Sequence, residues 1–96
     1  MESHARITVH RSSESLHLKL LGDFDDTLAC ELLEAVEKNS FGVHRVFVHT
    51  SSLRNIYSYN KDSFHENLSH LNGHAMRSLF TGEHASRIAP EKSLCI

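Results

Sequence analysis

Histidine is the residue type in this sequence that most directly suggests chemistry, because nine of the 96 residues are histidines. Imidazole nitrogens bind zinc, and a helical metal site needs its ligands on one face. His70 follows His65 by five residues, which turns the two side chains to different faces of a helix. A ligand set could still form in space from His10, His17 and His49. Since no spacing requires such a set, solvated histidines are favoured, and we expect no metal site and no cofactor.

Neither cysteine is placed as a nucleophile would be. Cys30 lies in an acidic amphipathic segment, where a reactive thiolate would lack the electropositive setting that it needs, and Cys95 is the penultimate residue. The carboxylates Asp23, Asp25 and Asp26 precede a predicted helix and are most simply turn and cap residues. We therefore predict no catalytic residues and expect that the chain is not an enzyme.

One short loop offers an alternative binding site. Thr81, Gly82 and Glu83 join a predicted strand to a short helix, and backbone amides at a helix N-terminus can hold an anion. A single glycine equally fits a plain strand-to-helix turn, which is the more frequent case. A small-molecule or anion sensor that binds at this loop is therefore the alternative function.

The composition restricts the class of protein. The chain is 40% apolar and 23% charged, with a formal net charge of −2, as is ordinary for a globular domain. No basic stripe with interleaved aromatic residues is visible along the sequence, so we expect no nucleic-acid partner. No apolar run approaches the roughly 20 residues of a membrane span, and the first ten residues lack the features of a secretory signal. We therefore expect no membrane span and a cytoplasmic location.

Between residues 16 and 36 the spacing of apolar residues changes from that of a strand to that of a helix. In residues 16–20 leucine alternates with polar residues, as in a half-buried strand. After Gly22, apolar residues recur at helical spacing over residues 28–36. The acidic residues 25–26 and Thr27 can cap the first turn of this helix.

The remaining elements follow from similar patterns. Strands are predicted over residues 5–9, 43–49 and 75–81, a second helix ends at residue 72, and a short helix spans residues 83–89 before Pro90. The second helix begins either at Asn60 or at a capping box formed by Ser63 and Glu66. A hairpin and two right-handed helical crossovers then give a mixed four-stranded sheet.

The predicted fold class is therefore α/β, in the order β-β-α-β-α-β-α, with the helices packed on one face of the sheet. The chain is long enough for one core, so residues 1–96 form a single domain. Its core is expected over about residues 5–89, with residues 90–96 as a loose tail. Leu16, Leu18 and Leu20 should lie beneath the helices, and His17 and Lys19 on the uncovered face.

Three segments carry a resemblance to a known family: residues 22–38 (GDFDDTLACELLEAVEK), 43–53 (VHRVFVHTSSL) and 56–60 (IYSYN). In this order they resemble a STAS domain, the module of anti-sigma factor antagonists and of sulphate-transporter tails. The resemblance covers about residues 7–89, and the chain is short for a member. The family's first crossover begins with Gly, an acidic residue, an apolar residue and Asp, as Gly22, Asp23, Phe24 and Asp25 do. Of its Asp-Ser-Ser/Thr-Gly signature only Ser58 is retained.

The resemblance implies a non-catalytic regulatory domain that binds a protein partner, such as an anti-sigma factor or a kinase-like regulator, in bacterial signalling. Ser58 stands where antagonists carry a phosphorylated serine, although a turn or cap residue is the simpler interpretation. The partner surface implied comprises Asp23, Asp25, Tyr57, Ser58, Tyr59 and Asn60. The oligomeric state is left open.

Overall fold

The computed structural model describes residues 6–39, 42–72, 77–89 and 94–95. It is a mixed α/β fold, as the sequence predicts. The elements are β1 (Ile7–Arg11), β2 (Ser15–Leu20), β3 (Gly22–Phe24), α1 (Asp26–Asn39), β4 (Arg45–His49), β5 (Leu53–Ile56), α2 (Lys61–Asn72), β6 (Arg77–Thr81), α3 (Ala85–Ile88) and β7 (Leu94–Cys95).

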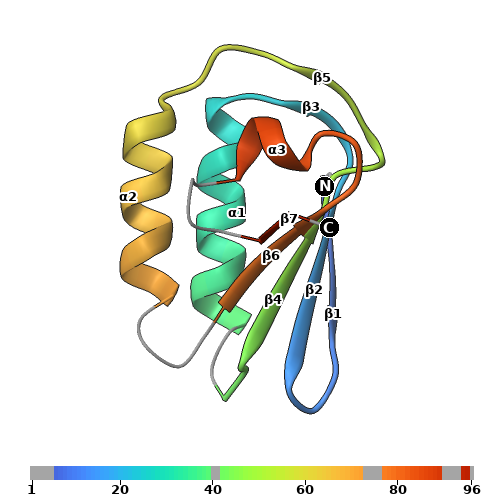
Figure 1. The fold of residues 1–96 in the computed structure, drawn as a ribbon, viewed down its shortest axis with the longest axis vertical. Helices are drawn as coiled ribbons and strands as arrows, with labels where there is room; N and C mark the ends of the chain where they lie inside the picture. Colours follow the sequence, from blue (N-terminus) through green and yellow to red (C-terminus); the bar gives the residue numbers. More distant parts are fainter. Residues whose placement is uncertain (1–5, 40–41, 73–76, 90–93, 96) are drawn as a thin grey trace, which may run out of the picture.

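The main sheet has the strand order β1-β2-β4-β6-β7 (Figure 1). β1 and β2 form an antiparallel hairpin, whereas β2, β4, β6 and β7 are parallel neighbours. Each parallel step passes through a helix, because parallel strands cannot be joined by a tight turn. The mixed sheet, its four predicted strands and its crossovers are thus confirmed, and β7 adds a fifth strand.

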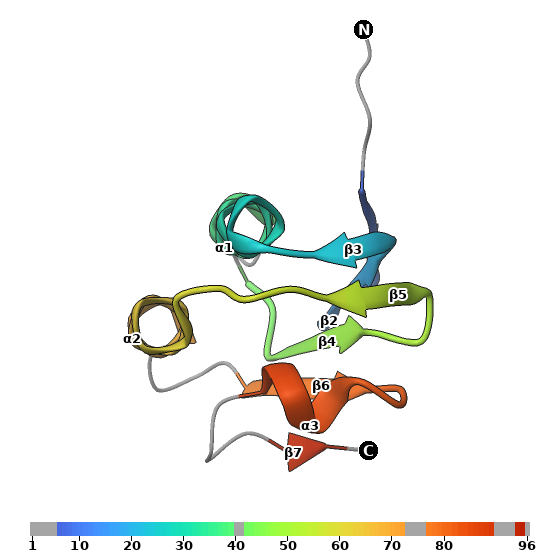
Figure 2. The same ribbon diagram turned by 90° about the horizontal axis from the view of Figure 1, so that it is seen from above.

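All three helices lie on the same side of the main sheet (Figure 2). Leu16, Leu18 and Leu20 of β2 are fully buried beneath the helices. Leu28 and Leu32, on α1 itself, are also fully buried. His17 is half-buried and Lys19 is exposed on the opposite side. The predicted assignment of the two sheet faces is therefore confirmed.

A second, two-stranded sheet was not predicted. In it β3 pairs in parallel with β5, with a bulge between Gly22 and Asp23. Its strands have only three and four residues, which is too short to show an alternating pattern. This pairing brings the segment before α1 beside the segment before α2.

The C-terminal segment is only partly described. The expected loose tail at residues 90–96 lies mostly outside the described residues, but within it Leu94–Cys95 pairs with β6. Part of the predicted strand over residues 75–81 likewise falls outside them. Among the helices described, none combines the length and apolarity that crossing a bilayer requires.

Candidate functional site

The turn that contains Ser58 is held at both ends by the segment that leads into α1. The Tyr57 amide donates to the Phe24 carbonyl oxygen at 2.8 Å, and the Asn60 amide donates to Asp26 Oδ1 at 2.8 Å. Asn60 is also the cap of α2, because its Oδ1 accepts from the Ser63 amide at 3.0 Å. Of the two predicted starts of α2, the structure thus has the one at Asn60.

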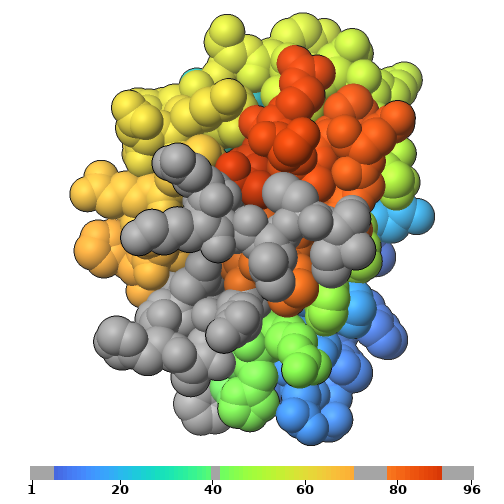
Figure 3. Space-filling view, in the orientation of Figure 1, coloured from blue at the N-terminus to red at the C-terminus, as the bar shows by residue number. Residues whose placement is uncertain are grey.

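Ser58 is exposed and lines an open pocket of about 290 Å³. The pocket lies between the β5–α2 segment and α3, which are neighbours in the space-filling view (Figure 3). Its lining residues are Ile56, Tyr57, Ser58, Tyr59, Lys61 and Arg87. Ser58 therefore shares this pocket with two cationic residues, Lys61 and Arg87, close to the positive end of the α2 dipole.

The two tyrosines beside Ser58 have different roles. The Tyr57 side chain is 54% exposed and projects from the surface. Tyr59 is half-buried, packs edge-on against Phe24 with ring centroids 4.9 Å apart, and donates its hydroxyl to the Arg87 carbonyl oxygen at 3.4 Å. Burial raises the pKa of Tyr59. Tyr59 therefore anchors the turn, and Tyr57 is the one available for contact.

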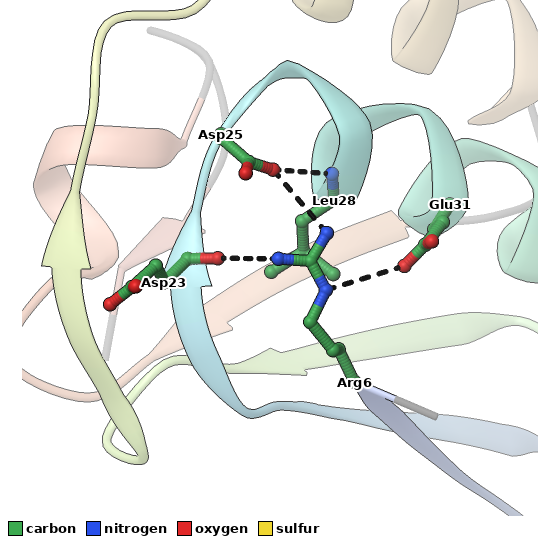
Figure 4. Close-up of polar contacts among 5 residues, drawn as sticks. All are labelled: Arg6, Asp23, Asp25, Leu28 and Glu31. Atoms are coloured by element: carbon green, nitrogen blue, oxygen red, sulfur yellow. Dashed lines mark hydrogen bonds and ion pairs between the residues drawn. The ribbon is translucent and has the colours of Figure 1, made fainter. Parts of the chain in front are cut away.

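The acidic residues before α1 are largely occupied by intramolecular bonds (Figure 4). Asp25 Oδ1 accepts from the Leu28 amide at 2.8 Å, which caps α1, and from Arg6 Nη2 at 3.4 Å. The bond from Leu28 is the main cause that lowers the pKa of Asp25, and the Arg6 guanidinium acts in the same direction. Asp23 Oδ1 accepts from Asn55 Nδ2 at 3.1 Å. Asp23 therefore links β3 to β5, whereas Asp25 caps α1 and pairs with Arg6.

Two amides that follow the loop at residues 81–83 are already engaged in hydrogen bonds. The His84 amide already donates to Thr50 Oγ1 at 3.2 Å, and the Ala85 amide donates to the Gly82 carbonyl oxygen at 3.2 Å. Thr81 Oγ1 lies 2.7 Å from His49 Nδ1, and Glu83 is exposed. The anion-sensor hypothesis for Thr81, Gly82 and Glu83 stays a prediction.

Three histidines singled out from the sequence lie on the helix-free side of the main sheet. His17 Nδ1 and His49 Nε2 share a hydrogen bond of 3.0 Å, and the His10 ring centroid is 6.1 Å from that of His17. In the described part of the chain, no three His, Cys, Asp or Glu side chains are grouped so as to hold a metal ion. The structure therefore joins the histidines by hydrogen bonding and ring packing.

The environment of His49 predicts that the stability of the fold depends on pH. Burial is the main cause that lowers the pKa of His49, and the charges of His17 and Lys19 act in the same direction. With a folded pKa below the unfolded value of about 6.5, the unfolded state binds more protons, so stability is present above this pH and is lost as the pH falls below it. In urea denaturation between about pH 5 and 7, His49→Gln should reduce this loss. The exposed His70 provides the control, since His70→Gln should leave the loss unchanged.

The two cationic residues of the Ser58 pocket were not predicted from the sequence. Lys61 is in the first turn of α2 and is close to Ser58 in sequence, so its cationic charge was a usable signal. Arg87 belongs to α3, and no pattern in the sequence indicates that α3 packs against the start of α2. The contact becomes evident only from bonds such as that between His65 Nε2 and the Ile88 carbonyl oxygen, at 3.0 Å.

Comparison with known proteins identifies the fold. No family model and no curated protein sequence matches the chain. Among solved structures, the anti-sigma factor antagonist SpoIIAA in its unphosphorylated form superposes with a TM-score of 0.66 at 12% identity, covering 94% of this chain and 86% of SpoIIAA. A Shewanella loihica protein of the DUF3478 family with a SpoIIAA-like fold gives a TM-score of 0.56 at 15% identity, covering 100% of this chain and 90% of that protein.

A larger protein contains the same fold as one part. The structure of Mglu gives a TM-score of 0.66 at 19% identity, and the match covers 98% of this chain but only 23% of Mglu. At these identities the similarity shows the fold and no more. The chain thus has a STAS-like, SpoIIAA-like fold, as its sequence resemblance implies.

Proposed function

We propose that this chain is a non-catalytic regulatory domain that binds a protein partner through the turn containing Ser58, in cytoplasmic bacterial signalling. The observation that carries the proposal is the position of Ser58, exposed in a pocket lined by Lys61 and Arg87 on a STAS-like fold. SpoIIAA, which shares the fold, is an anti-sigma factor antagonist. By this analogy the partner is an anti-sigma factor or a kinase-like regulator.

The surface offered to the partner combines one aromatic anchor with a polar surround. Tyr57 is one of two large apolar side chains that stand out as exposed among the described residues, and tyrosine contributes contact area at low entropy cost. Asp23, Asp26, Tyr59 and Asn60 hold the turn in place through the bonds described above, and Asp25 caps the adjacent helix α1. The turn is therefore preorganised, which limits the entropy lost on binding.

Phosphorylation of Ser58 would change the charge of this surface without requiring the fold to change. A phosphate brings about −1.5 to −2 charges, which Lys61 and Arg87 and the α2 dipole would stabilise. A partner that presents a carboxylate to the same two cations would then be displaced by competition and by charge repulsion. The proposed switch therefore acts on binding and leaves the stability of the domain nearly unchanged.

Substitutions in the turn test this proposal. With a partner recovered by affinity purification, Ser58→Asp and Tyr57→Ala should each weaken binding about tenfold in calorimetry, or about 1.4 kcal/mol. Both positions are exposed, so the free energy of unfolding should change by less than about 0.5 kcal/mol.

A matched control is available on α2. Ser69 is exposed on the same helix but far along it from the turn, so Ser69→Asp adds the same charge away from the pocket. Its affinity should equal that of the wild type. Wild-type affinity in both turn variants would remove this surface as the partner site.

A further inference from the structure

The helix-free side of the main sheet carries a defined set of side chains, which we call the open face. Strand register places Thr8, Lys19, His49 and Thr81 in one row across β1, β2, β4 and β6. The adjacent row contains His10, His17, Phe47 and Leu79. Directly opposed residues share a face, so these residues lie on one side of the sheet, the side that Figure 2 shows without helices, although Leu79 is buried there.

The charged groups of this surface have one sign. Lys19 and Arg45 are exposed cations, and the three imidazoles can each accept a proton. None of the described β1, β2, β4 and β6 residues that face His49 is a carboxylate. In the β1–β2 hairpin the single acidic residue, Glu14, lies in the turn. By contrast, α1 alone carries four acidic residues and one lysine, on a chain whose formal charge is −2.

The rings of the open face are ordered against one another. The planes of His17 and Phe47 differ by 7° with centroids 4.7 Å apart, so their faces are in contact. The ring planes of His17 and His49 differ by 4°, and the two rings share a hydrogen bond of 3.0 Å. His49 Nδ1 lies 2.7 Å from Thr81 Oγ1, so the row of hydrogen bonds extends from β2 to β6. Ring faces already packed together are poorly available for stacking on nucleobases. What the surface offers is imidazole N–H groups beside ammonium and guanidinium cations.

We propose that the open face binds an acidic segment of a protein partner, whose carboxylates lie over Lys19, Arg45 and the His17–His49 pair. Charge complementarity selects this occupant, because the described residues of the open face include no carboxylate, whereas Lys19 and Arg45 are exposed cations beside proton-accepting rings. This surface is distinct from the Ser58 turn, so the inference does not depend on the function proposed above.

Binding of carboxylates should favour protonation of the histidines. A carboxylate close to an imidazole stabilises its charged form, which offsets the desolvation that lowers the pKa of His49. The bound state would then hold more protons than the free state, so affinity must increase as the pH falls. Lys19 and Arg45 supply the part of the affinity that does not depend on the protonation of the histidines.

Titration calorimetry with octaglutamate as the probe tests the inference. Binding should be at least about fivefold tighter at about pH 6 than at about pH 7.5, and two buffers of different ionisation enthalpy should reveal proton uptake. The double variant Lys19→Gln/Arg45→Gln should lose binding by about tenfold or more, and His49→Gln should reduce the pH dependence. Matched controls are Arg54→Gln and His70→Gln, which remove exposed groups outside the open face and should bind as the wild type does.

Several outcomes would overturn the inference. The absence of octaglutamate binding, or equal binding by the double variant and by Arg54→Gln, would show that the open face does not select acidic segments. Tighter binding of polyuridylate would identify a nucleic-acid surface, and tighter binding of phosphatidylserine vesicles would identify a membrane surface. Comparable melting temperatures for all variants are required, so that a loss of binding reports on the surface and not on unfolding.

Discussion

Replacing Gly82 with alanine is expected to cost about 2–4 kcal/mol of the free energy of unfolding. Gly82 has a φ of 100°, a backbone conformation that side-chain-bearing residues rarely adopt. An added Cβ would also lie 2.6 Å from Thr50 Oγ1 and 2.7 Å from the Ser51 backbone nitrogen. Thr50 Oγ1 donates to the Thr81 carbonyl oxygen and accepts from the His84 amide, so moving it would break two bonds.

A matching substitution at Gly22 separates the two causes of this loss of stability, which are backbone strain and the close approach of the added Cβ. Its φ is 83°, but no atom lies within 4 Å of the position that a Cβ would take. Gly22→Ala should therefore show backbone strain alone, about 1 kcal/mol, in parallel urea denaturation. Equal losses for the two variants would mean that the close approach of Gly82 to the β4–β5 turn adds nothing to the cost.

Much of the fold could be predicted from the sequence because its longer elements carry clear periods. Alternation in β2 and helical spacing in α1 are each long enough to identify the element and the side that it buries. β3, β5 and β7 have two to four residues each and exist through pairing with a neighbour, so their local sequence has no period to detect. The predicted four-stranded sheet therefore lacked the smallest parts of the structure.

The candidate site was predictable only where it is local in sequence. Residues 57–60 are contiguous, and their relation to the segment at Asp23 followed from a family resemblance. Arg87 reaches the Ser58 pocket through the packing of α3, and the His17–His49 contact depends on the register between β2 and β4. Such contacts are set by tertiary structure, which explains why spacing alone gave no reason to pair the two histidines.

Phe24 links the stability of the core to the geometry of the Ser58 turn. Phe24 is fully buried, and its ring meets the ring of Tyr59 edge-on. The centroid of the Phe64 ring lies 6.0 Å from that of Phe24, with an angle of 76° between the two ring planes. Its carbonyl oxygen accepts the hydrogen bond from the Tyr57 amide. The same residue thus supports the core between α1 and α2 and the aromatic anchor of the turn.

Phe24→Ala should cost about 3–5 kcal/mol, because it removes a buried ring and leaves a cavity. That is a large part of the roughly 5–15 kcal/mol that stabilises a domain, whereas Phe24→Leu should cost less than about 2 kcal/mol. The cavity should also expose Tyr59, whose raised pKa depends on burial, so this pKa should fall toward its ordinary value. Ultraviolet titration can follow it in a Tyr57→Phe background, because the chain has only two tyrosines. If Phe24→Ala lowers stability while the pKa of Tyr59 stays raised, the turn is held by its backbone bonds to the α1 segment, and the ring contact contributes only to the core.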